Sequence, residues 1–91
     1  MIIYKATCSI TNKSYIGYTT KHLYERVQSH VNSVLADSTT HFHRALRKHG
    51  FKSFTWKILQ ICSSIEDLKF YEILWIEAHN SFHIGYNMTR G

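Results

Sequence analysis

Two short runs of β-branched and aromatic residues open the chain, and they constrain its fold more than any other feature. The runs are MIIYKATC at 1–8 and SYIGY at 14–18, with the polar segment Thr11-Asn12-Lys13 between them. Such side chains favour the pleated, half-buried surface of a strand, and a short polar segment between two of them favours a tight turn. The sequence therefore predicts an N-terminal β-hairpin.

Helical spacing follows the hairpin. Apolar residues recur three or four positions apart at Leu23, Val27, Val31 and Val34, which predicts an amphipathic helix from Lys21 to about Leu35. A second, shorter and basic helix is predicted from Phe42, Ala45, Leu46 and His49. Gly50 follows this helix, and we expect it to form a left-handed C-terminal cap.

The last part of the chain predicts one more strand and one more helix. Residues 54–62, FTWKILQIC, alternate and then become wholly apolar, which is typical of a central strand. Ser64 with Asp67 indicates a capping box that opens a third helix, running to about Asn80. The order β-β-α-α-β-α predicts an α+β fold, a small three-stranded, mainly antiparallel sheet flanked by about three helices. With 91 residues and no linker or repeat, one domain over 1–91 is expected.

Positive charge indicates a polyanionic partner. The chain has 11 Lys and Arg against 6 Asp and Glu, a net charge of +5. No acidic residue lies between Asp37 and Glu66, so the excess is concentrated in the middle third. We expect a nucleic-acid-binding surface there. Its candidate residues are Arg44, Arg47, Lys48, Lys52 and Lys57.

The two cysteines and the hydropathy pattern indicate the setting of the protein. Cys8 and Cys62 are far apart and lack CxxC spacing, so they are expected to pack in the core rather than form a disulfide or zinc site. No run approaches the roughly 20 apolar residues of a membrane span, and no signal peptide begins at Met1. We expect an intracellular protein without a membrane partner, cytoplasmic, or nuclear in a eukaryotic or viral system.

Glu72 is the residue least compatible with a purely structural helix. The wheel of the third predicted helix places it on the apolar side, among Leu68, Trp75, Ile76 and His79. An unpaired carboxylate there costs on the order of several kcal/mol unless a cation or hydrogen bonds compensate. A metal ion is one compensation, and a salt bridge at the rim is the other. On the wheel alone, the salt bridge is favoured.

Four further residues could take part in phosphate chemistry. Arg26 and His30 lie one turn apart on the first predicted helix, where they could bind one phosphate or form ordinary solvated surface. Tyr4 and Tyr15 lie in the two hairpin strands, where cross-strand packing is the commoner role. A tyrosine could act as a base only if Arg26 and a metal at Glu72 lowered its pKa well below about 10.

Five elements, in order along the chain, resemble the motifs of the GIY-YIG nuclease family. They are Ile2-Ile3-Tyr4 with Tyr15-Ile16-Gly17, Arg26 with His30, RALRKHG at 44–50, Glu72 in EILWI, and Gly85-Tyr86-Asn87. Together they are far more specific than any single tripeptide. Ile2 stands where the family commonly has Gly. Since this position begins a strand expected at the sheet edge, we expect a slight backbone adjustment there.

The resemblance implies a metal-dependent reaction on DNA. Glu72 would hold a single Mg²⁺ or Mn²⁺ ion, which polarises the scissile phosphate. One-step hydrolysis would leave 5′-phosphate and 3′-hydroxyl ends. The resemblance implies that Tyr4 orients or deprotonates the attacking water with support from Tyr15, and that Arg26 binds the phosphate.

The remaining roles implied by the resemblance are supporting ones. His30 would assist proton handling or phosphate contact, and Asn87 would brace the site. Gly17 would let the second strand turn away near the cleft. The other histidines have spacings that suit no zinc site, and most are expected at the surface or facing phosphates. They are His22, His41, His43, His49, His79 and His83.

Two other function classes compete with the nuclease. A non-catalytic DNA-binding module, with helices near 22–36 and 40–49 as a helix-turn-helix, explains the charge but not Glu72. A structural or protein-interaction domain explains neither the charge nor the motifs. For a nuclease, three arrangements stay open: a stand-alone enzyme, a homodimer, and a fragment of a homing endonuclease whose C-terminal DNA-binding domain is absent from this chain.

Overall fold

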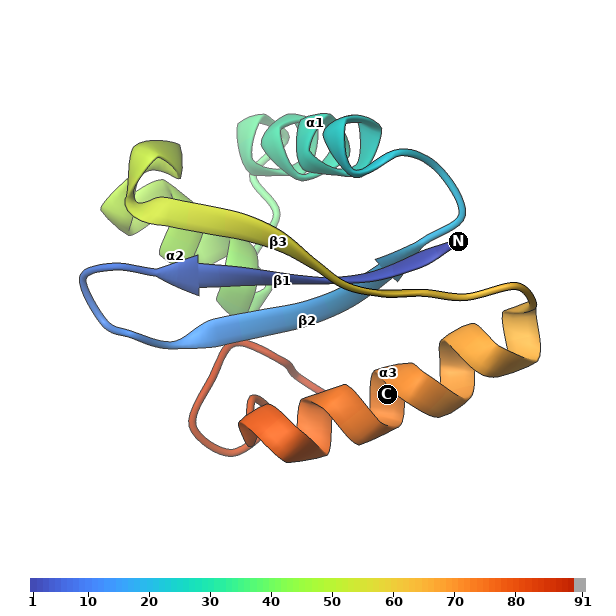
Figure 1. The fold of residues 1–91 in the computed structure, drawn as a ribbon. Helices are drawn as coiled ribbons and strands as arrows, with labels where there is room; N and C mark the ends of the chain where they lie inside the picture. The colour runs from blue at the N-terminus through green and yellow to red at the C-terminus, as the bar shows by residue number, and fades with distance from the viewer. Residues whose placement is uncertain (90–91) are drawn as a thin grey trace.

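The strands and helices of the protein follow the predicted order (Figure 1). The structure is a computed structural model that describes residues 1–89. The α+β prediction, with three strands and three helices, is confirmed. The elements are β1 (Ile2–Cys8), β2 (Ser14–Thr19), α1 (Leu23–Leu35), α2 (His41–His49), a 3₁₀ turn η1 (Phe51–Ser53), β3 (Phe54–Ile61) and α3 (Ile65–His79).

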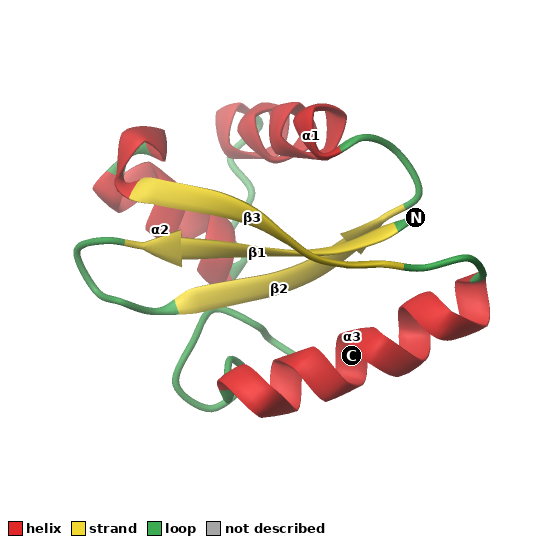
Figure 2. Ribbon diagram, in the orientation of Figure 1, coloured by secondary structure: helices red, strands yellow, loops and turns green. Residues whose placement is uncertain are grey.

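The sheet is wholly antiparallel, with the strand order β2-β1-β3 (Figure 2). β1 is therefore the central strand, and the prediction that residues 54–62 form the central strand is wrong. The apolar run of β3 does not reflect full burial, because Ile58 and Ile61 are 46% and 79% exposed. A run of apolar side chains predicts burial of the faces of a strand, and it carries no information on pairing at its two edges.

The central position of β1 also corrects the expectation for Ile2. Its backbone pairs with Thr19 on one side and Ile61 on the other, so it does not lie at a sheet edge. The pairing of β1 with β3 becomes irregular between Ile3 and Tyr4. Ile3 pairs with Gln60 but Tyr4 pairs with Ile58, which leaves an extra residue in β3. Such bulges re-aim neighbouring side chains, and this one adjoins Tyr4.

Each face of the sheet has its own hydrophobic core. One face packs under α1 and α2 and the other under α3, so β1 contributes side chains to both. Cys8 and Cys62 are free and buried, as predicted. The first core contains Ala6, Cys8, Val34, Phe42, Ala45, Leu46, Phe54 and Tyr86. The second contains Ile3, Ile16, Cys62, Leu68 and Ile76.

Local hydrogen bonds set the ends of the helices. Ser64 Oγ accepts from the backbone N–H of Asp67 at 3.1 Å and caps α3 as predicted. Gly50 ends α2, but its φ of 84° and ψ of 151° differ from the predicted left-handed cap. This region is open almost only to glycine, and it directs the chain straight into η1. Within residues 1–89, no helix has the length and apolarity needed to cross a bilayer.

Candidate active site

Two adjoining hollows gather residues from β2, α1 and α3. The larger, of about 470 Å³, is lined by Tyr15, Arg26 and Glu72 together with Tyr18, Thr19, Thr20, Lys21, Glu25 and Ser29. The smaller, of about 310 Å³, shares Tyr15, Arg26 and Glu72 and also reaches His30 and Asn87. α3 lies beside β2 (Figure 1), which lets a residue of α3 reach the same hollow as α1. Candidate residues that are far apart in sequence therefore surround one space.

Tyr4 does not line either hollow, but it connects the hairpin to α1 and contacts residues that do. Its side chain has no solvent exposure, and its hydroxyl shares a 2.7 Å hydrogen bond with Nε2 of His30. Nε of Arg26 donates to the same oxygen at 3.2 Å. The ring of Tyr15 lies 6.2 Å from that of Tyr4, centroid to centroid. Both predicted tyrosines and both predicted α1 residues thus form one contact group.

Gly17 lies directly opposite Tyr4 in the hairpin. A Cβ at this position would collide with Oη and Cζ of Tyr4 and would lie 2.8 Å from Cε2 of Tyr15. β2 continues in register to Thr19, so the predicted turning of the strand at Gly17 is not observed. The glycine instead provides the space that the phenol of Tyr4 occupies.

Burial dominates the acidity of the two tyrosines. It raises the pKa of Tyr4 well above its usual value, and neighbouring Tyr15 raises it further. It also raises the pKa of Tyr15, with a further contribution from the charge of Glu72. Arg26 acts in the predicted direction and lowers both pKa values, but burial outweighs it. Arg26 alone therefore does not turn either phenol into a base near neutral pH.

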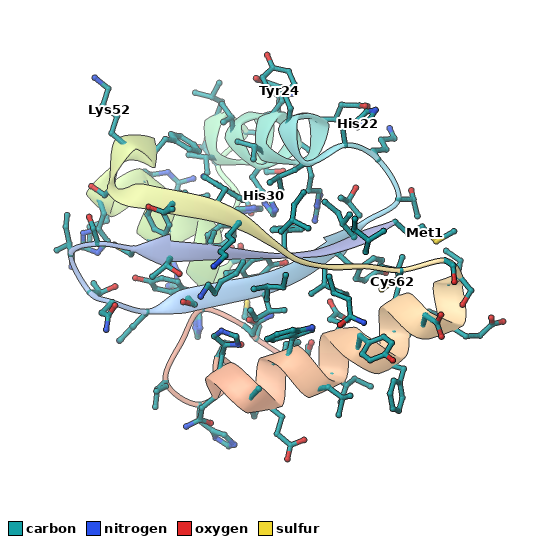
Figure 3. The ribbon with its side chains drawn as sticks, viewed as in Figure 1. Met1, His22, Tyr24, His30, Lys52 and Cys62 are labelled. Carbon is teal, nitrogen blue, oxygen red and sulfur yellow. The ribbon has the colours of Figure 1, made fainter. Side chains whose placement is uncertain are left out.

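His30 is buried and neutral. It points from α1 toward the sheet, whereas Tyr24 on the same helix points away from it (Figure 3). Burial, followed by the charges of Arg26 and His43, lowers the pKa of His30 to about 3. Its Nδ1 shares a 2.7 Å hydrogen bond with Nε2 of His43. His43 therefore belongs to the site, which its sequence spacing gave no signal to predict.

Glu72 has no compensating partner among residues 1–89. It is half-buried on α3, and burial raises the pKa of its carboxyl. No described Lys or Arg forms an ion pair with it, and no hydrogen bond to it is formed within the described chain, so the salt-bridge alternative is not observed. A half-buried carboxylate facing a polar hollow has the hard oxygen donors that Mg²⁺ and Mn²⁺ prefer.

The protein offers few ligands besides this carboxylate. Within residues 1–89, no three His, Cys, Asp or Glu side chains are grouped so that they could hold a metal ion. Mg²⁺ commonly keeps several waters and binds through one or two carboxylates together with substrate phosphates. Glu72 and Glu25 both line the larger hollow, and one or two carboxylates fit such a shared site, in which the substrate completes the coordination.

Asn87 secures β2 from the side opposite β1. Its Oδ1 accepts from the N–H of Ile16 and its Nδ2 donates to the C=O of Ile16, each at 2.8 Å. The N–H of Tyr86 also donates to the C=O of Ser14 at 2.9 Å. The buried amide thus pairs with one residue of the strand that carries Tyr15, and the bracing role of Asn87 stays a prediction.

The five predicted nucleic-acid-binding residues lie away from the hollows. Among the described residues that line the two hollows, the cations are Lys21 and Arg26. Lys52 lies in η1, just before β3 begins, and it points away from the body of the protein (Figure 3). Arg47 donates to the carbonyls of Val34 and Ser38, both at 3.0 Å, and so ties α2 to the end of α1 and to the loop between these helices.

Lys21 is a further hollow-lining residue that the sequence did not single out. It follows the end of β2 in the connection to α1, four residues before Glu25. Its position directly after a strand that carries a candidate residue was the available signal. The remaining basic candidates, Arg44, Lys48 and Lys57, are exposed.

Comparisons with known proteins identify a matching family and similar solved structures. The family model described as the GIY-YIG catalytic domain matches residues 1–87. The catalytic domain of intron endonuclease I-TevI, in a glutamate-to-alanine mutant form, is similar with a TM-score of 0.86 and 27% identity, covering 98% of this chain and 93% of that one. A structure of the catalytic domain of homing endonuclease I-TevI has a TM-score of 0.82 and 27% identity, covering 96% of each chain. No sequence among the curated proteins matches.

Proposed function

The chain belongs to the GIY-YIG family of catalytic domains, as the sequence motifs predicted, and on that premise we propose that this endonuclease domain cleaves DNA with a divalent metal ion. One observation carries the proposal. Tyr15, Arg26 and Glu72 come from three different elements and line the same hollow. A non-catalytic DNA-binding module gives no reason for a half-buried carboxylate that has neither an ion pair nor a hydrogen bond within residues 1–89.

Glu72 would hold the metal. A carboxylate whose pKa is raised by burial gains stability when a cation binds it, because the cation replaces the lost hydration. A single Mg²⁺ or Mn²⁺ ion would supply Lewis-acid polarisation of the scissile phosphate and stabilisation of the leaving 3′ oxygen. The substrate phosphate and water would provide the other ligands.

Arg26 would bind the phosphate under attack. Its Nε is engaged with Tyr4, and its guanidinium lines both hollows. A planar guanidinium stabilises the negative charge that develops on the phosphoryl oxygens in the transition state. The link to Tyr4 would therefore fix the position of the phosphate relative to the group that handles the proton of water.

Tyr4 would orient the attacking water and receive its proton, with Tyr15 supporting the geometry. The oxygen of the water would bond to phosphorus while the bond from phosphorus to the 3′ oxygen breaks. The 3′ oxygen would take a proton from solvent, so the products would be 5′-phosphate and 3′-hydroxyl ends. His30 would take part through its hydrogen bond to Tyr4, and Asn87 would keep β2 in place through Ile16.

Replacement of Glu72 tests the proposal. Glu72→Gln keeps the size of the side chain and removes the charge, so cleavage of plasmid DNA in Mg²⁺ or Mn²⁺ should fall by about 10²-fold or more, the scale seen when one electrostatic stabiliser is lost. DNA affinity at fixed salt should change little, because affinity depends mainly on basic residues. Glu77→Gln, on the exposed face of the same helix, is the matched control and should cleave as the wild type does.

Two results would overturn the proposal. One is wild-type cleavage that continues at full rate after removal of divalent metal by a chelator. The other is full activity in Glu72→Gln. Binding of DNA without any cleavage by the wild type would favour the binding-module alternative.

A further inference from the structure

A line of hydrogen bonds continues from Tyr4 beyond His30 to a loop near the surface. The Tyr4 hydroxyl meets Nε2 of His30 at 2.7 Å, and Nδ1 of His30 meets Nε2 of His43 at 2.7 Å. Nδ1 of His43 then meets Oγ of Ser38 at 2.6 Å. Both ring nitrogens of His30 and both of His43 take part in these hydrogen bonds, and each of the three bonds is short. The line crosses from β1 through α1 and α2 to the loop between those helices.

The burial of this line makes charged intermediates unfavourable. The pKa of Tyr4 is raised by burial, so its phenolate is disfavoured. The pKa of His30 is lowered to about 3 by burial, Arg26 and His43, so its imidazolium is disfavoured as well. Neither Tyr4 as a phenolate nor His30 as an imidazolium is therefore suited to act in proton transfer near neutral pH.

His43 is held neutral by its surroundings. The groups that face it are His30 and Arg26 of α1, Arg47 of its own helix, and Ser38 of the preceding loop. Burial first, and then the charges of Arg26 and Arg47, lower the pKa of His43. No carboxylate among these contacts favours an imidazolium. His43, like His30, therefore favours its neutral form.

Two neutral imidazoles in series permit only two orientations of the hydrogen bonds. In one, Tyr4 donates to His30, His30 donates from Nδ1 to His43, and His43 donates from Nδ1 to Ser38. In the other, every bond is reversed, so Ser38 donates to His43 and His30 donates from Nε2 to Tyr4. A neutral imidazole has one donor and one acceptor nitrogen, which couples the two tautomers.

We propose that His30, His43 and Ser38 form a proton relay that carries the proton taken up by Tyr4 out to solvent. The relay rests on the proposed nuclease function. As water attacks phosphorus, its proton passes to Oη of Tyr4 while the phenol proton passes to Nε2 of His30. The Nδ1 proton of His30 moves to Nε2 of His43, and the Nδ1 proton of His43 moves to Oγ of Ser38. The hydroxyl proton of Ser38 passes to solvent, so one proton leaves the water, one leaves the protein, and no residue keeps a charge.

His43 acts through His30 and is a positioning residue rather than a catalytic one. Its replacement should therefore change the rate of the proton transfer and leave substrate binding alone. His43→Gln retains a polar side chain of similar reach, but an amide does not pass protons as an imidazole does. We expect kcat to fall by about 10²-fold, the lower end of the range for general acid–base catalysis, with KM within about twofold of the wild type.

A solvent isotope experiment reports the relay directly. With saturating plasmid DNA and Mg²⁺, the dependence of kcat on the deuterium fraction should be curved for the wild type, because several protons move together. It should become linear and shallower in His43→Gln. His41→Gln, an exposed histidine on the same helix, should retain the wild-type rate and curvature. Full kcat in His43→Gln, or a linear dependence in the wild type, would overturn the relay.

Nitrogen NMR of the histidine rings tests the relay without any cleavage. Both His30 and His43 should be neutral at pH 7 to 8 and should occupy the same tautomer, and His43→Gln should change the tautomer balance of His30. A charged His43 at pH 7, or opposite tautomers in the two rings, would overturn the relay whatever the enzyme does. Failure of the wild type to cleave DNA with correct tautomers would count against the proposed function instead.

Discussion

Gly17→Ala should destabilise the protein strongly because it fills the space of a buried phenol. The added Cβ would overlap Oη and Cζ of Tyr4, and Tyr4 has no solvent-exposed surface into which it could move. Overpacking of a core costs about 1–3 kcal/mol. Displacement of the Tyr4 hydroxyl from His30 adds about 1 kcal/mol for a lost buried hydrogen bond.

The total of about 2–4 kcal/mol corresponds to a fall in Tm of roughly 10–25 °C for a domain of this size. Urea unfolding followed by circular dichroism measures the free energy of unfolding, and a thermal scan measures Tm. If the clash with Tyr4 causes the destabilisation, the Tyr4 hydroxyl should account for part of the lost free energy of unfolding. Tyr4→Phe combined with Gly17→Ala should then be at least about 1 kcal/mol more stable than the sum of the single effects predicts.

Gly50→Ala is the matched control for this coupling. Its Cβ would have no atom within 4 Å, and its φ of 84° gives a purely backbone cost. The destabilisation by Gly50→Ala should add to the destabilisation by Tyr4→Phe, with no coupling between the two substitutions. Additive behaviour of Gly17→Ala with Tyr4→Phe, within about 0.5 kcal/mol, would refute the steric reasoning, as would a Gly17→Ala variant of wild-type stability.

Two further predictions concern ionisable groups of the site. Glu72→Gln should raise Tm by about 2–6 °C at pH 7 in metal-free buffer, because it removes a half-buried carboxylate whose pKa is raised by burial; an unchanged or lower Tm would contradict this. The pKa of His30 is lowered from 6.5 to about 3, so the unfolded chain binds its proton more readily than the folded chain does. The stability that neutral His30 contributes is thus fully present above pH 6.5 and is lost as pH falls, by up to about 1.4 kcal/mol per pH unit. The Tm of His30→Gln measured from pH 7 to pH 4.5 should fall less than that of the wild type, and parallel curves would contradict the assignment.

The sequence predicted those parts of the fold that local patterns determine. Hairpin and helix patterns depend on neighbours in the chain, so Ser64 capped α3 as predicted and Glu72 lay on the predicted side of α3. Strand order depends on which strands pair at each edge, and the apolar run of β3 gave no information about that. The central position of β1 was therefore missed.

The sequence motifs predicted residues of the site, but they did not predict the contacts that these residues make. Gly17 was singled out, but its role depends on the ring of Tyr4 across the hairpin, which only the register reveals. His43 meets His30 thirteen residues away through helix packing, and no periodicity indicates such a contact. Arg47 was counted as a phosphate-binding charge, whereas its guanidinium binds two backbone carbonyls.

The two cores of the sheet also affect when the candidate site is complete during folding. Tyr4 is buried against α1, on one face, while Glu72 comes from the helix that covers the other. A nascent or damaged chain in which only one layer has docked holds either the phenol or the acid in place, never both. On the proposed mechanism, cleavage would therefore require that both helical layers have docked on the sheet.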